Sequence, residues 1–548
     1  MARQRVSPRP VLPWPAFTAV PALATGRTHR TSRARALRSI LAALSCLAVA
    51  AAGSACSVDD ANDANSAGSP ERSATTTESR PATFRPDECP MAIPASVTIE
   101  VDCGRLRVPE NRDEPDSRTI ELAVARLHSR AADPRPDPVV ELSGGPGFPS
   151  LSRLERWATS PLLDRRDVIL FDQRGLGFSD PNLDCIETNE AIWRSFTTTD
   201  PGDVEGQRIL DSLASCRQRL VADGVDLDGY DTIQSAADVA DLRRALGIDQ
   251  WNLRGVSYGS ALAMEVMRRH PEGLRTVLLD SVVPPDTPAG GVQRGKSALR
   301  AFEQLYDACA ADNACTAKYG DLKALVAQAV TSLDTDPYRL TVTDPATGRA
   351  WDVAITGRDL YAGFFRAMYD PTLIPALPSA TQAIANGDRS IIEVLAPGGI
   401  EFAASAAEGM TYSVSCADRQ RLLDPDAVAP LDAEHPELAS VIHPLLPELA
   451  CQGWGVDASP QSFNALLTGA DNDVPVLVMA GAFDPVTPPR GTRRVADALG
   501  KELLLFPDAG HGAIATDCGR NIWLTFMDHP TAPPDTSCMD NLATPTFP

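Results

Sequence analysis

Short apolar runs recur along the chain, and they alternate with segments of helical periodicity. Runs of this kind, rich in Val, Ile and Leu, occupy 139–142, 167–171, 251–254, 276–282, 475–480 and 502–506. Strands that are apolar throughout are buried on both faces, which is typical of a parallel sheet covered by helices on both sides. The sequence therefore predicts an α/β fold with a mostly parallel sheet.

Three further elements are predicted within the same pattern. The segments 97–101 and 104–108 flank a short turn and predict an opening hairpin, and 119–127 alternates as a half-buried strand does. Ser235 and Asp238 form a pattern close to a capping box, so we expect a helix from Ser235 to Leu246, where Gly247 ends it.

The interval between 276–282 and 475–480 is too long for a loop in a compact domain. It predicts one hairpin, at 338–342 and 350–355, and several helices, at 295–311, 321–333, 357–368 and 374–385. We interpret it as a mainly helical cap inserted into the sheet domain, above the carboxyl ends of the strands. A chain of 548 residues is long enough for both parts, with the core at 86–284 and 466–548 and the cap at 285–465.

The N-terminus has the layout of an export signal at 1–56. Arg-rich sequence precedes an apolar run at 40–52 that is too short to span a bilayer, and small residues follow it. Cys56, directly after Gly-Ser-Ala, resembles the lipid-modified cysteine of bacterial lipoproteins, although Gly53 stands where such signals usually carry Leu. The alternatives are a lipid anchor at Cys56 and plain secretion after cleavage beside Ala55. The polar residues 57–85 lack periodicity and predict a disordered tether.

Charge and cysteine content bear on the class of function. The net charge is −22, and the charged side chains of the first 56 residues are all Arg, so the remainder is more acidic still. This balance argues against nucleic-acid binding and fits a soluble exported protein. No C-x-x-C pair or dinucleotide fingerprint is present, so no metal or cofactor is expected. Ten cysteines follow Cys56 and predict a disulfide framework, for which sequence order favours bridges between neighbours: 89–103, 185–216, 309–315, 416–451 and 518–538.

The stretch NLRGVSYGSALAMEV, from Asn252 to Val266, begins as a strand and continues as an apolar helix. Ser257 lies at the turn between two glycines. A tight turn that needs small residues would explain this pattern, and so would a catalytic nucleophile on a strained strand-to-helix elbow. A serine nucleophile needs a histidine base and a carboxylate that orients the base. These groups are expected after later strands.

Two later turns carry suitable residues. His511 lies in Gly-His-Gly just after the run 502–506, whereas the other histidines beyond the signal precede a proline or end a strand. Asp484 follows the run 475–480 in AGAFDPVTP, and Asp280, at the end of the preceding strand, is the second candidate. We favour Asp484 because its strand adjoins the one that leads to His511.

A tetrahedral intermediate also requires two backbone N–H donors for its oxyanion. Tyr258, the residue after the nucleophile, is expected to supply one. The turn Gly-Gly-Pro-Gly at 144–147 follows the run 139–142 and is placed to supply the other, with Gly145 as first choice and Gly144 as second. Because a plain turn does not account for the common position of these groups at strand ends, the sequence predicts that Ser257 is a nucleophile.

Five segments carry a family resemblance: SGGPG, FDQRGLGFSD, GVSYGS, GAFDPVTP and GHG. Together they resemble the prolyl and tripeptidyl aminopeptidases of the α/β-hydrolase family, in the secreted actinobacterial branch with a TAP-like C-terminal region. The resemblance runs from about Cys89 to Cys538. It implies oxyanion donors at Gly145 and Tyr258 and a catalytic triad of Ser257, Asp484 and His511.

The resemblance also concerns two neighbouring segments. It implies that the segment DQRG forms a structural loop with an internal ion pair between Asp172 and Arg174. Ser143 departs from the family, because many members carry His or Asn before the Gly-Gly-Pro-Gly turn. This departure leaves the oxyanion turn intact and concerns the orientation of the substrate.

The resemblance implies an exported serine aminopeptidase that releases short units from peptides with a free N-terminus. An esterase or other acyl hydrolase with the same triad is the alternative, because one fold hosts many reactions. A catalytically inactive binding protein is disfavoured, since no triad member is missing. An aminopeptidase must pair the substrate's α-ammonium group with an anion. Glu408 in the cap is the first candidate and Asp418 the second, with an ordinary surface acid as the alternative for either.

Overall fold

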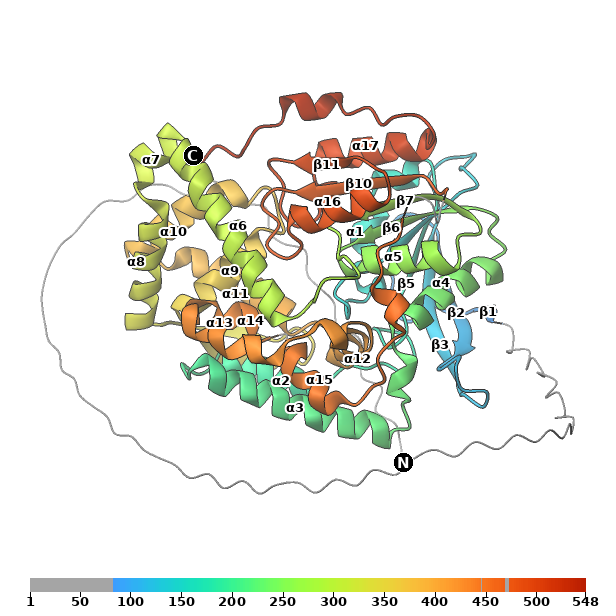
Figure 1. Cartoon of the computed structure of the whole chain (residues 1–548), viewed down its shortest axis with the longest axis horizontal. Helices are drawn as coiled ribbons and strands as arrows, with labels where there is room; N and C mark the ends of the chain where they lie inside the picture. The colour runs from blue at the N-terminus through green and yellow to red at the C-terminus, as the bar shows by residue number, and fades with distance from the viewer. Residues whose placement is uncertain (1–81, 445, 469–472) are drawn as a thin grey trace, which may run out of the picture. The chain divides into compact units, whose positions relative to one another are not determined.

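A nine-stranded sheet forms the centre of the computed structural model, which describes residues 82–444, 446–468 and 473–548 (Figure 1). The strand order is β1-β2-β3-β5-β4-β6-β7-β10-β11. The strands from β5 to β11 are parallel, and β1, β2 and β3 extend the sheet in antiparallel fashion beyond β5. The mostly parallel α/β fold predicted from the sequence is therefore confirmed.

The six apolar runs form the parallel part of this sheet. They correspond to β4 (Val139–Leu142), β5 (Val168–Phe171), β6 (Trp251–Val256), β7 (Leu274–Asp280), β10 (Val476–Gly481) and β11 (Leu503–Phe506). Neighbouring residues of a strand enter the hydrophobic cores on opposite faces, as Ile169 and Leu170 of β5 do. This burial on both faces is what the continuous apolar runs require.

Helices cover both faces of the sheet. One core includes residues of α4 (Thr232–Ala245), α5 (Tyr258–Arg269) and α16 (Pro489–Ala498). The opposite core includes residues of α1 (Leu154–Ala158) and α17 (Asp517–Asp528). The helix α4 starts earlier than expected, because the Asp231 carboxylate accepts the backbone N–H of Gln234 at 2.6 Å and caps it there.

The first strands differ from the predicted hairpin. The partner of β2 (Val101–Pro109) is β1 (Thr83–Pro86), and residues 97–100 form no strand. Residues 83–85, which the sequence assigned to the tether, therefore belong to a strand instead. The ring of Phe84 lies where a side chain at position 104 would be, so Gly104 allows the two strands to pack. The strand β3 (Thr119–Leu127) is confirmed as predicted.

The inserted region is mainly helical, as predicted. Its helices are α6 (Gly291–Ala311), α7 (Asn313–Tyr319), α8 (Leu322–Thr335), α9 (Gly357–Ala367), α10 (Leu377–Ala385), α11 (Ser390–Ala403), α12 (Glu408–Arg419), α13 (Val428–Glu434), α14 (Ala439–Ile442) and α15 (Pro447–Trp454). The hairpin of β8 (Tyr338–Thr343) and β9 (Ala350–Ile355) interrupts them.

Two helices from earlier in the chain pack against this insertion (Figure 1). They are α2 (Ile186–Ser195) and α3 (Gly202–Ala222), which follow β5. Trp193 of α2 stacks on Trp351 of β9, and Glu205 of α3 pairs with Arg358 of α9. We refer to the insertion as the cap.

The five predicted local disulfides are confirmed. They join Cys89 to Cys103, Cys185 to Cys216, Cys309 to Cys315, Cys416 to Cys451 and Cys518 to Cys538. Two bridges lie within the cap, and the last ties α17 to the C-terminal segment.

Candidate active site

Ser257 lies at a strained turn between β6 and α5. Its backbone angles, φ 58° and ψ −130°, are rare for a residue with a side chain. A Cβ at Gly255 would lie 2.5 Å from the carbonyl oxygen of Gly259, and one at Gly259 would overlap the carbonyl oxygen of Leu142. Gly255 is therefore required where the elbow packs against α5, and Gly259 where α5 packs against β4. The turn has the form of a nucleophile elbow.

Asp484 and His511 form a buried pair after β10 and β11. The Nδ1 atom of His511 lies 3.0 Å from each carboxylate oxygen of Asp484. Asp484 is fully buried and His511 nearly so. The structure therefore brings together the acid and base that the sequence favoured, and it leaves the imidazole Nε2 as the atom available for proton transfer.

The Asp484 carboxylate is held in its ionised form. It accepts the backbone N–H of Val486 and Thr487, each at 2.8 Å, and the Thr487 hydroxyl at 2.7 Å. Burial alone would raise the pKa of Asp484, but the charge of His511 and these hydrogen bonds outweigh it and lower the pKa below its ordinary value. An ionised carboxylate is what stabilises an imidazolium during proton transfer.

Asp280, the second candidate for the acid, has other partners. Its carboxylate accepts the backbone N–H of Ala513 at 3.1 Å and of Ile514 at 2.8 Å. Burial raises the pKa of Asp280 to about 6. Asp280 therefore anchors the chain that follows His511, whereas Asp484 contacts the imidazole itself.

The cap holds the loop of His511 directly. The backbone N–H of His511 donates to the carbonyl oxygen of Met368 at 3.0 Å, and the His511 ring lies 4.7 Å from that of Tyr369. A side chain at Gly510 would overlap the Met368 carbonyl. The sequence showed no sign of these contacts, because Met368 and Tyr369 lie in an unremarkable segment after α9.

The Gly-Gly-Pro-Gly turn lies beside Ser257. A Cβ at Gly144 would be 3.2 Å from the Cβ of Ser257, closer than such contacts usually are, so a side chain there would require the elbow to shift. Gly145 has φ +118° and is exposed. Among the described residues, nothing accepts a hydrogen bond from the N–H of Gly145 or of Tyr258, the first residue of α5. Both expected oxyanion donors are therefore open at the elbow.

Ser143, the departure from the family pattern, takes part in holding this turn. Its carbonyl oxygen accepts the Gln173 amide at 3.0 Å, and its hydroxyl accepts the Arg153 guanidinium at 2.8 Å. Ser143 is itself buried.

The helix α12 of the cap is hydrogen-bonded to the Gly-Gly-Pro-Gly turn. Ala407 donates its N–H to the Gly147 carbonyl at 2.9 Å, and the Thr411 hydroxyl donates to the Pro146 carbonyl at 2.6 Å. Glu408 is the first residue of α12 and is buried, so the structure places this candidate next to the oxyanion turn.

Asp418, the other candidate for the anion, lies near the far end of α12. Its carboxylate accepts the Ser459 hydroxyl at 3.1 Å and the Thr232 hydroxyl at 2.5 Å. Burial and the neighbouring Asp231 raise the pKa of Asp418 to about 7. These contacts join α12 to α4 behind Tyr258, whose hydroxyl also hydrogen-bonds to Thr232 at 2.8 Å.

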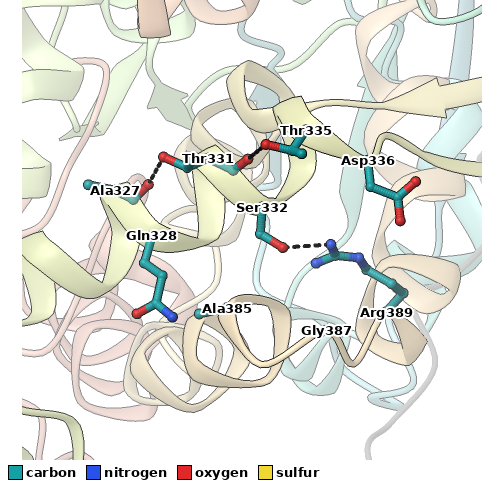
Figure 2. A pocket seen from close by; sticks show the side chains of 9 residues that line it. All are labelled: Ala327, Gln328, Thr331, Ser332, Thr335, Asp336, Ala385, Gly387 and Arg389. Atoms are coloured by element: carbon teal, nitrogen blue, oxygen red, sulfur yellow. Dashed lines mark hydrogen bonds between the residues drawn. The ribbon is translucent and has the colours of Figure 1, made fainter. Parts of the chain in front are cut away.

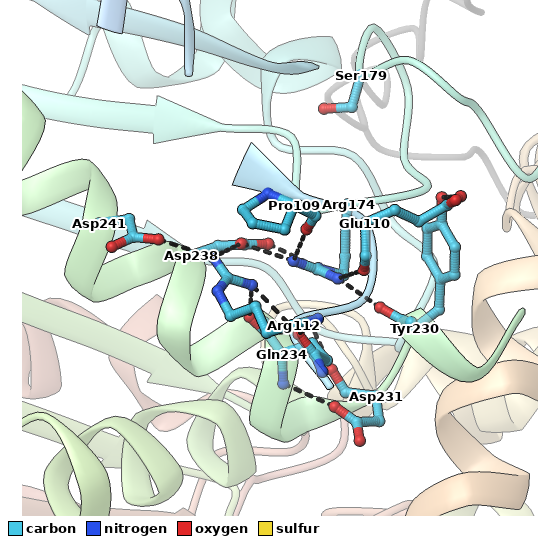
Figure 3. Close-up of polar contacts among 12 residues, drawn as sticks. Pro109, Glu110, Arg112, Arg174, Ser179, Tyr230, Asp231, Gln234, Asp238 and Asp241 are labelled. Atoms are coloured by element: carbon cyan, nitrogen blue, oxygen red, sulfur yellow. Dashed lines mark hydrogen bonds and ion pairs between the residues drawn. The ribbon is translucent and has the colours of Figure 1, made fainter. Parts of the chain in front are cut away.

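The predicted ion pair between Asp172 and Arg174 is wrong. Arg174 instead pairs with Asp238 of α4 through two nitrogen–oxygen contacts of 2.7 Å, as Figure 3 shows. Asp172 accepts the backbone N–H of Leu151 and of Phe178, each at 2.9 Å. Both residues lie in the loop that follows β5, and this loop directs their side chains to different partners. Burial raises the pKa of Asp172 to about 6.

Other cavities and clusters lie outside this site. A groove of the cap between α8 and α10 is lined by Ser332 and Arg389, hydrogen-bonded at 2.8 Å, and by none of the triad candidates (Figure 2). One group of three potential metal ligands occurs among the described residues, namely Glu100, Asp102 and His128. His128 and Asp102 are joined at 2.8 Å, and both acids are exposed.

Comparison with known proteins agrees with this architecture. Residues 137–517 match the family described as the alpha/beta hydrolase fold. The chain belongs to the α/β-hydrolase family. This α/β-hydrolase is 24% identical to serine protease Hip1 of Mycobacterium tuberculosis over 459 residues, covering 79% of this chain and 86% of the relative. It is 27% identical to the tripeptidyl aminopeptidase of Streptomyces coelicolor over 442 residues, covering 75% and 77%.

The solved structure of a proline iminopeptidase from Mycobacterium smegmatis is also similar. It has a TM-score of 0.34 and 16% identity, and covers 78% of this chain and 98% of that one. The family and its serine protease and aminopeptidase members identify this chain as a serine hydrolase.

The predicted signal, Cys56 and most of the tether lie outside the described residues. Within the part of the chain that is described, no single helix has the length and apolar character to cross a membrane. One pair of helical segments, Ser390–Ala403 and Glu408–Leu422, meets that criterion jointly but is bent by 59°.

Proposed function

We propose that the protein is an exported serine aminopeptidase that releases short units from the free N-terminus of peptides. The buried Asp484–His511 pair, placed after neighbouring strands of the same sheet edge as the Ser257 elbow, is the observation that carries this proposal. The named relatives include a serine protease and a tripeptidyl aminopeptidase, and both align over most of the chain.

In the proposed reaction Ser257 attacks the scissile carbonyl and its proton passes to Nε2 of His511. Asp484 stabilises the imidazolium that forms. The N–H groups of Tyr258 and Gly145 bind the developing oxyanion, as the positive end of α5 also favours. The imidazolium then protonates the leaving amine, and the acyl group remains on Ser257 until water hydrolyses the ester.

Recognition of the free N-terminus is assigned to Glu408. A carboxylate in a partly dehydrated site offsets the cost of taking an ammonium group out of water. Glu408 begins the helix that binds the Pro146 and Gly147 carbonyls, so it is fixed relative to the oxyanion turn. Asp418 is less suitable because it lies near the far end of α12, where its carboxylate contacts Thr232 and Ser459 instead of the oxyanion turn.

Export is supported by the sequence before residue 57 and by the five disulfides. Disulfides of this density persist in oxidising compartments and are rare in the cytosol. We propose lipid attachment at Cys56, which would place the enzyme on the outer face of the cell membrane.

The substrate class is tested with purified protein and three kinds of chromogenic substrate. These are peptides with a free N-terminus, the same peptides N-acetylated, and short p-nitrophenyl esters. The proposal requires rapid cleavage of the free-amine peptides and slow cleavage of the acetylated ones. Equal rates on both peptides, or hydrolysis of the esters alone, would replace it with the acyl-hydrolase alternative. A Ser257→Ala preparation controls for contaminating peptidases.

A further inference from the structure

A wall of aromatic rings connects the oxyanion turn with the imidazole of His511. Phe148, directly after Gly147, stacks on Phe402 of α11 at 5.1 Å between ring centres. Phe402 meets Tyr369 edge-on at 5.8 Å, and Tyr369 contacts the His511 ring at 4.7 Å. The rings therefore line one continuous side of the candidate active site.

One arginine of the cap packs on this wall, and a second packs on a ring beside it. The guanidinium carbon of Arg366, on α9, lies 4.3 Å from the ring centre of Phe402 and 4.9 Å from that of Tyr369. Arg294, on α6, lies 4.6 Å from the ring centre of Phe365, which in turn contacts Tyr369 at 5.8 Å. Tyr369 therefore connects the two arginines, since it contacts Arg366 directly and Arg294 through the ring of Phe365.

Neither guanidinium has an anionic partner within the described part of the chain. Neither takes part in an ion pair there, and the Nε atom of each is buried without a hydrogen-bond acceptor. The nearest acid along the chain, Asp370, accepts the hydroxyl and the N–H of Thr372 instead.

Other arginines of the same two helices have partners for their terminal nitrogens. Arg358 of α9 pairs with Glu205 at 2.6 Å, and Arg300 of α6 donates to the carbonyl oxygens of Ala482 and Asp484, although the Nε atom of each is also buried without an acceptor. Acidic side chains outnumber basic ones by 72 to 50 in the whole chain, so a shortage of acids does not explain the unpaired groups.

Removing a guanidinium from water without a counter-ion is unfavourable. Burial lowers the pKa of both Arg294 and Arg366, which is the direction expected for cations that lack a partner. Stacking on aromatic faces compensates in part and holds each planar group in a fixed orientation. A bound carboxylate would restore the missing charge and accept two parallel hydrogen bonds.

We propose that Arg366 and Arg294 form a carboxylate-binding subsite, so that the enzyme prefers substrates bearing a negative charge close to the scissile bond. This inference names the substrate class of the site described above and rests on that site being catalytic. The carboxylate has two possible sources, an acidic side chain or the free C-terminus of a short peptide.

Matched substrate pairs separate these sources. One pair has Glu or Gln in the released unit, and another has a free or an amidated C-terminus. A third pair consists of mono-p-nitrophenyl glutarate and p-nitrophenyl pentanoate, so the inference is tested even where peptides are not cleaved. We expect kcat/KM to be about tenfold higher or more for the carboxylate member of at least one pair, and the preference to fall as salt is raised. A ratio near one in every pair overturns the inference.

Variants connect the preference to the two residues. Arg366→Gln and Arg294→Gln should each reduce the selectivity ratio towards one, and Arg366→Lys should restore it only in part because Lys lacks the planar fork. Arg349→Gln is the matched control, since Arg349 is also a cap arginine stacked on an aromatic ring, at 3.6 Å from the Trp351 ring centre. It should keep the full ratio.

Labelling of Ser257 with a fluorophosphonate confirms that each variant is folded and separates the two proposals. If the wild-type enzyme is labelled but cleaves free-amine and N-acetylated peptides equally well, the aminopeptidase proposal fails. The ester pair then still tests the carboxylate-binding subsite. If Arg366→Gln and Arg294→Gln are both labelled and both keep the wild-type ratio, the subsite is excluded. Should Arg366→Gln fail to fold, the Arg294→Gln result decides alone.

Discussion

His511 of the core and Met368 of the cap are joined by a backbone hydrogen bond of 3.0 Å. The candidate base is therefore positioned by two parts of the molecule. Asp484 orients its ring from the core, and the end of α9 holds its backbone from the cap. The same division occurs at the oxyanion turn, where Thr411 of α12 binds the Pro146 carbonyl. The cap thus supports the candidate base and the candidate oxyanion turn.

Replacement of the triad residues should remove activity without unfolding the protein. Ser257→Ala, His511→Ala and Asp484→Asn are each expected to lower kcat by about 10⁴-fold or more, since the base, its tautomer and the nucleophile act as a unit. Steady-state kinetics and circular dichroism measure the two properties. Asp280→Asn is the comparison: a nearly wild-type Asp484→Asn beside an inactive Asp280→Asn would reverse the assignment of the acid.

The contact between cap and base can be tested at Gly510. Gly510→Ala would place a methyl group against the Met368 carbonyl and push the His511 loop away from α9. We expect a fall in kcat of about 10²-fold, because small displacements of a catalytic group are costly. Gly363→Ala in α9 is a suitable control, since no atom lies within 4 Å of the added Cβ. Equal activity of the two variants would show that the contact does not position the base.

Glu408→Gln should weaken recognition of the substrate's amino group. The amide keeps the size of the side chain but removes its charge, so KM for free-amine peptides should rise by about tenfold or more. The rise should be much smaller for an N-acetylated substrate, which has no ammonium group to bind. Parallel Michaelis–Menten measurements on the two substrates provide the comparison, and an equal rise on both would assign Glu408 a purely structural role.

The disulfide between Cys518 and Cys538 should support both stability and activity. Cys518 lies in the first turn of α17, just after the loop that carries His511. Replacing both cysteines with Ser should cost about 2–5 kcal/mol of unfolding free energy and also lower kcat. The disulfide Cys309–Cys315 closes a loop of only six residues, so its removal should cost less unfolding free energy than removal of Cys518–Cys538. Urea unfolding and kinetics of both double variants test this order.

Stability should fall as the pH rises from about 4 to 7. Burial raises the pKa of Asp172 and Asp280 to about 6 and that of Asp418 to about 7. In the unfolded chain these groups lose their protons near their ordinary pKa, at about 4. The folded state therefore binds more protons within this window, and the unfolding free energy decreases with pH. Asp484 acts in the opposite sense only at lower pH, because its folded pKa is below the ordinary value.

Denaturant unfolding at several pH values checks this dependence. Asp418→Asn removes one of the titrating groups, so its unfolding free energy should depend less on pH than that of the wild-type protein. Asp249→Asn, at an exposed position, should leave the slope unchanged. A wild-type profile that is flat or rises between pH 4 and pH 7 would contradict the prediction.

The sequence alone determined the features that depend on local pattern. Mostly apolar runs located the six parallel strands, because burial on both faces requires apolar side chains at most of their positions. Ser257, Asp484 and His511 could be selected because glycines and strand ends marked their turns, and the disulfides could be paired because each bridge joins neighbouring cysteines. Thr487 was not predicted, although a local signal marks it. It lies three residues after Asp484, in a turn that brings its hydroxyl to the carboxylate.

Only the tertiary structure decided which distant groups meet. Asp280 and Asp484 both follow buried strands, and their different partners arise from the way the chain after β11 folds back over the sheet. Arg174 pairs with Asp238 rather than with Asp172 for a similar reason. Asp238 is 64 residues away in the sequence, and the fold brings its carboxylate to the buried guanidinium of Arg174. The pairing of β1, the cap contacts of His511 and the unpaired state of Arg366 likewise depend on long-range packing, which leaves no periodic trace in a single sequence.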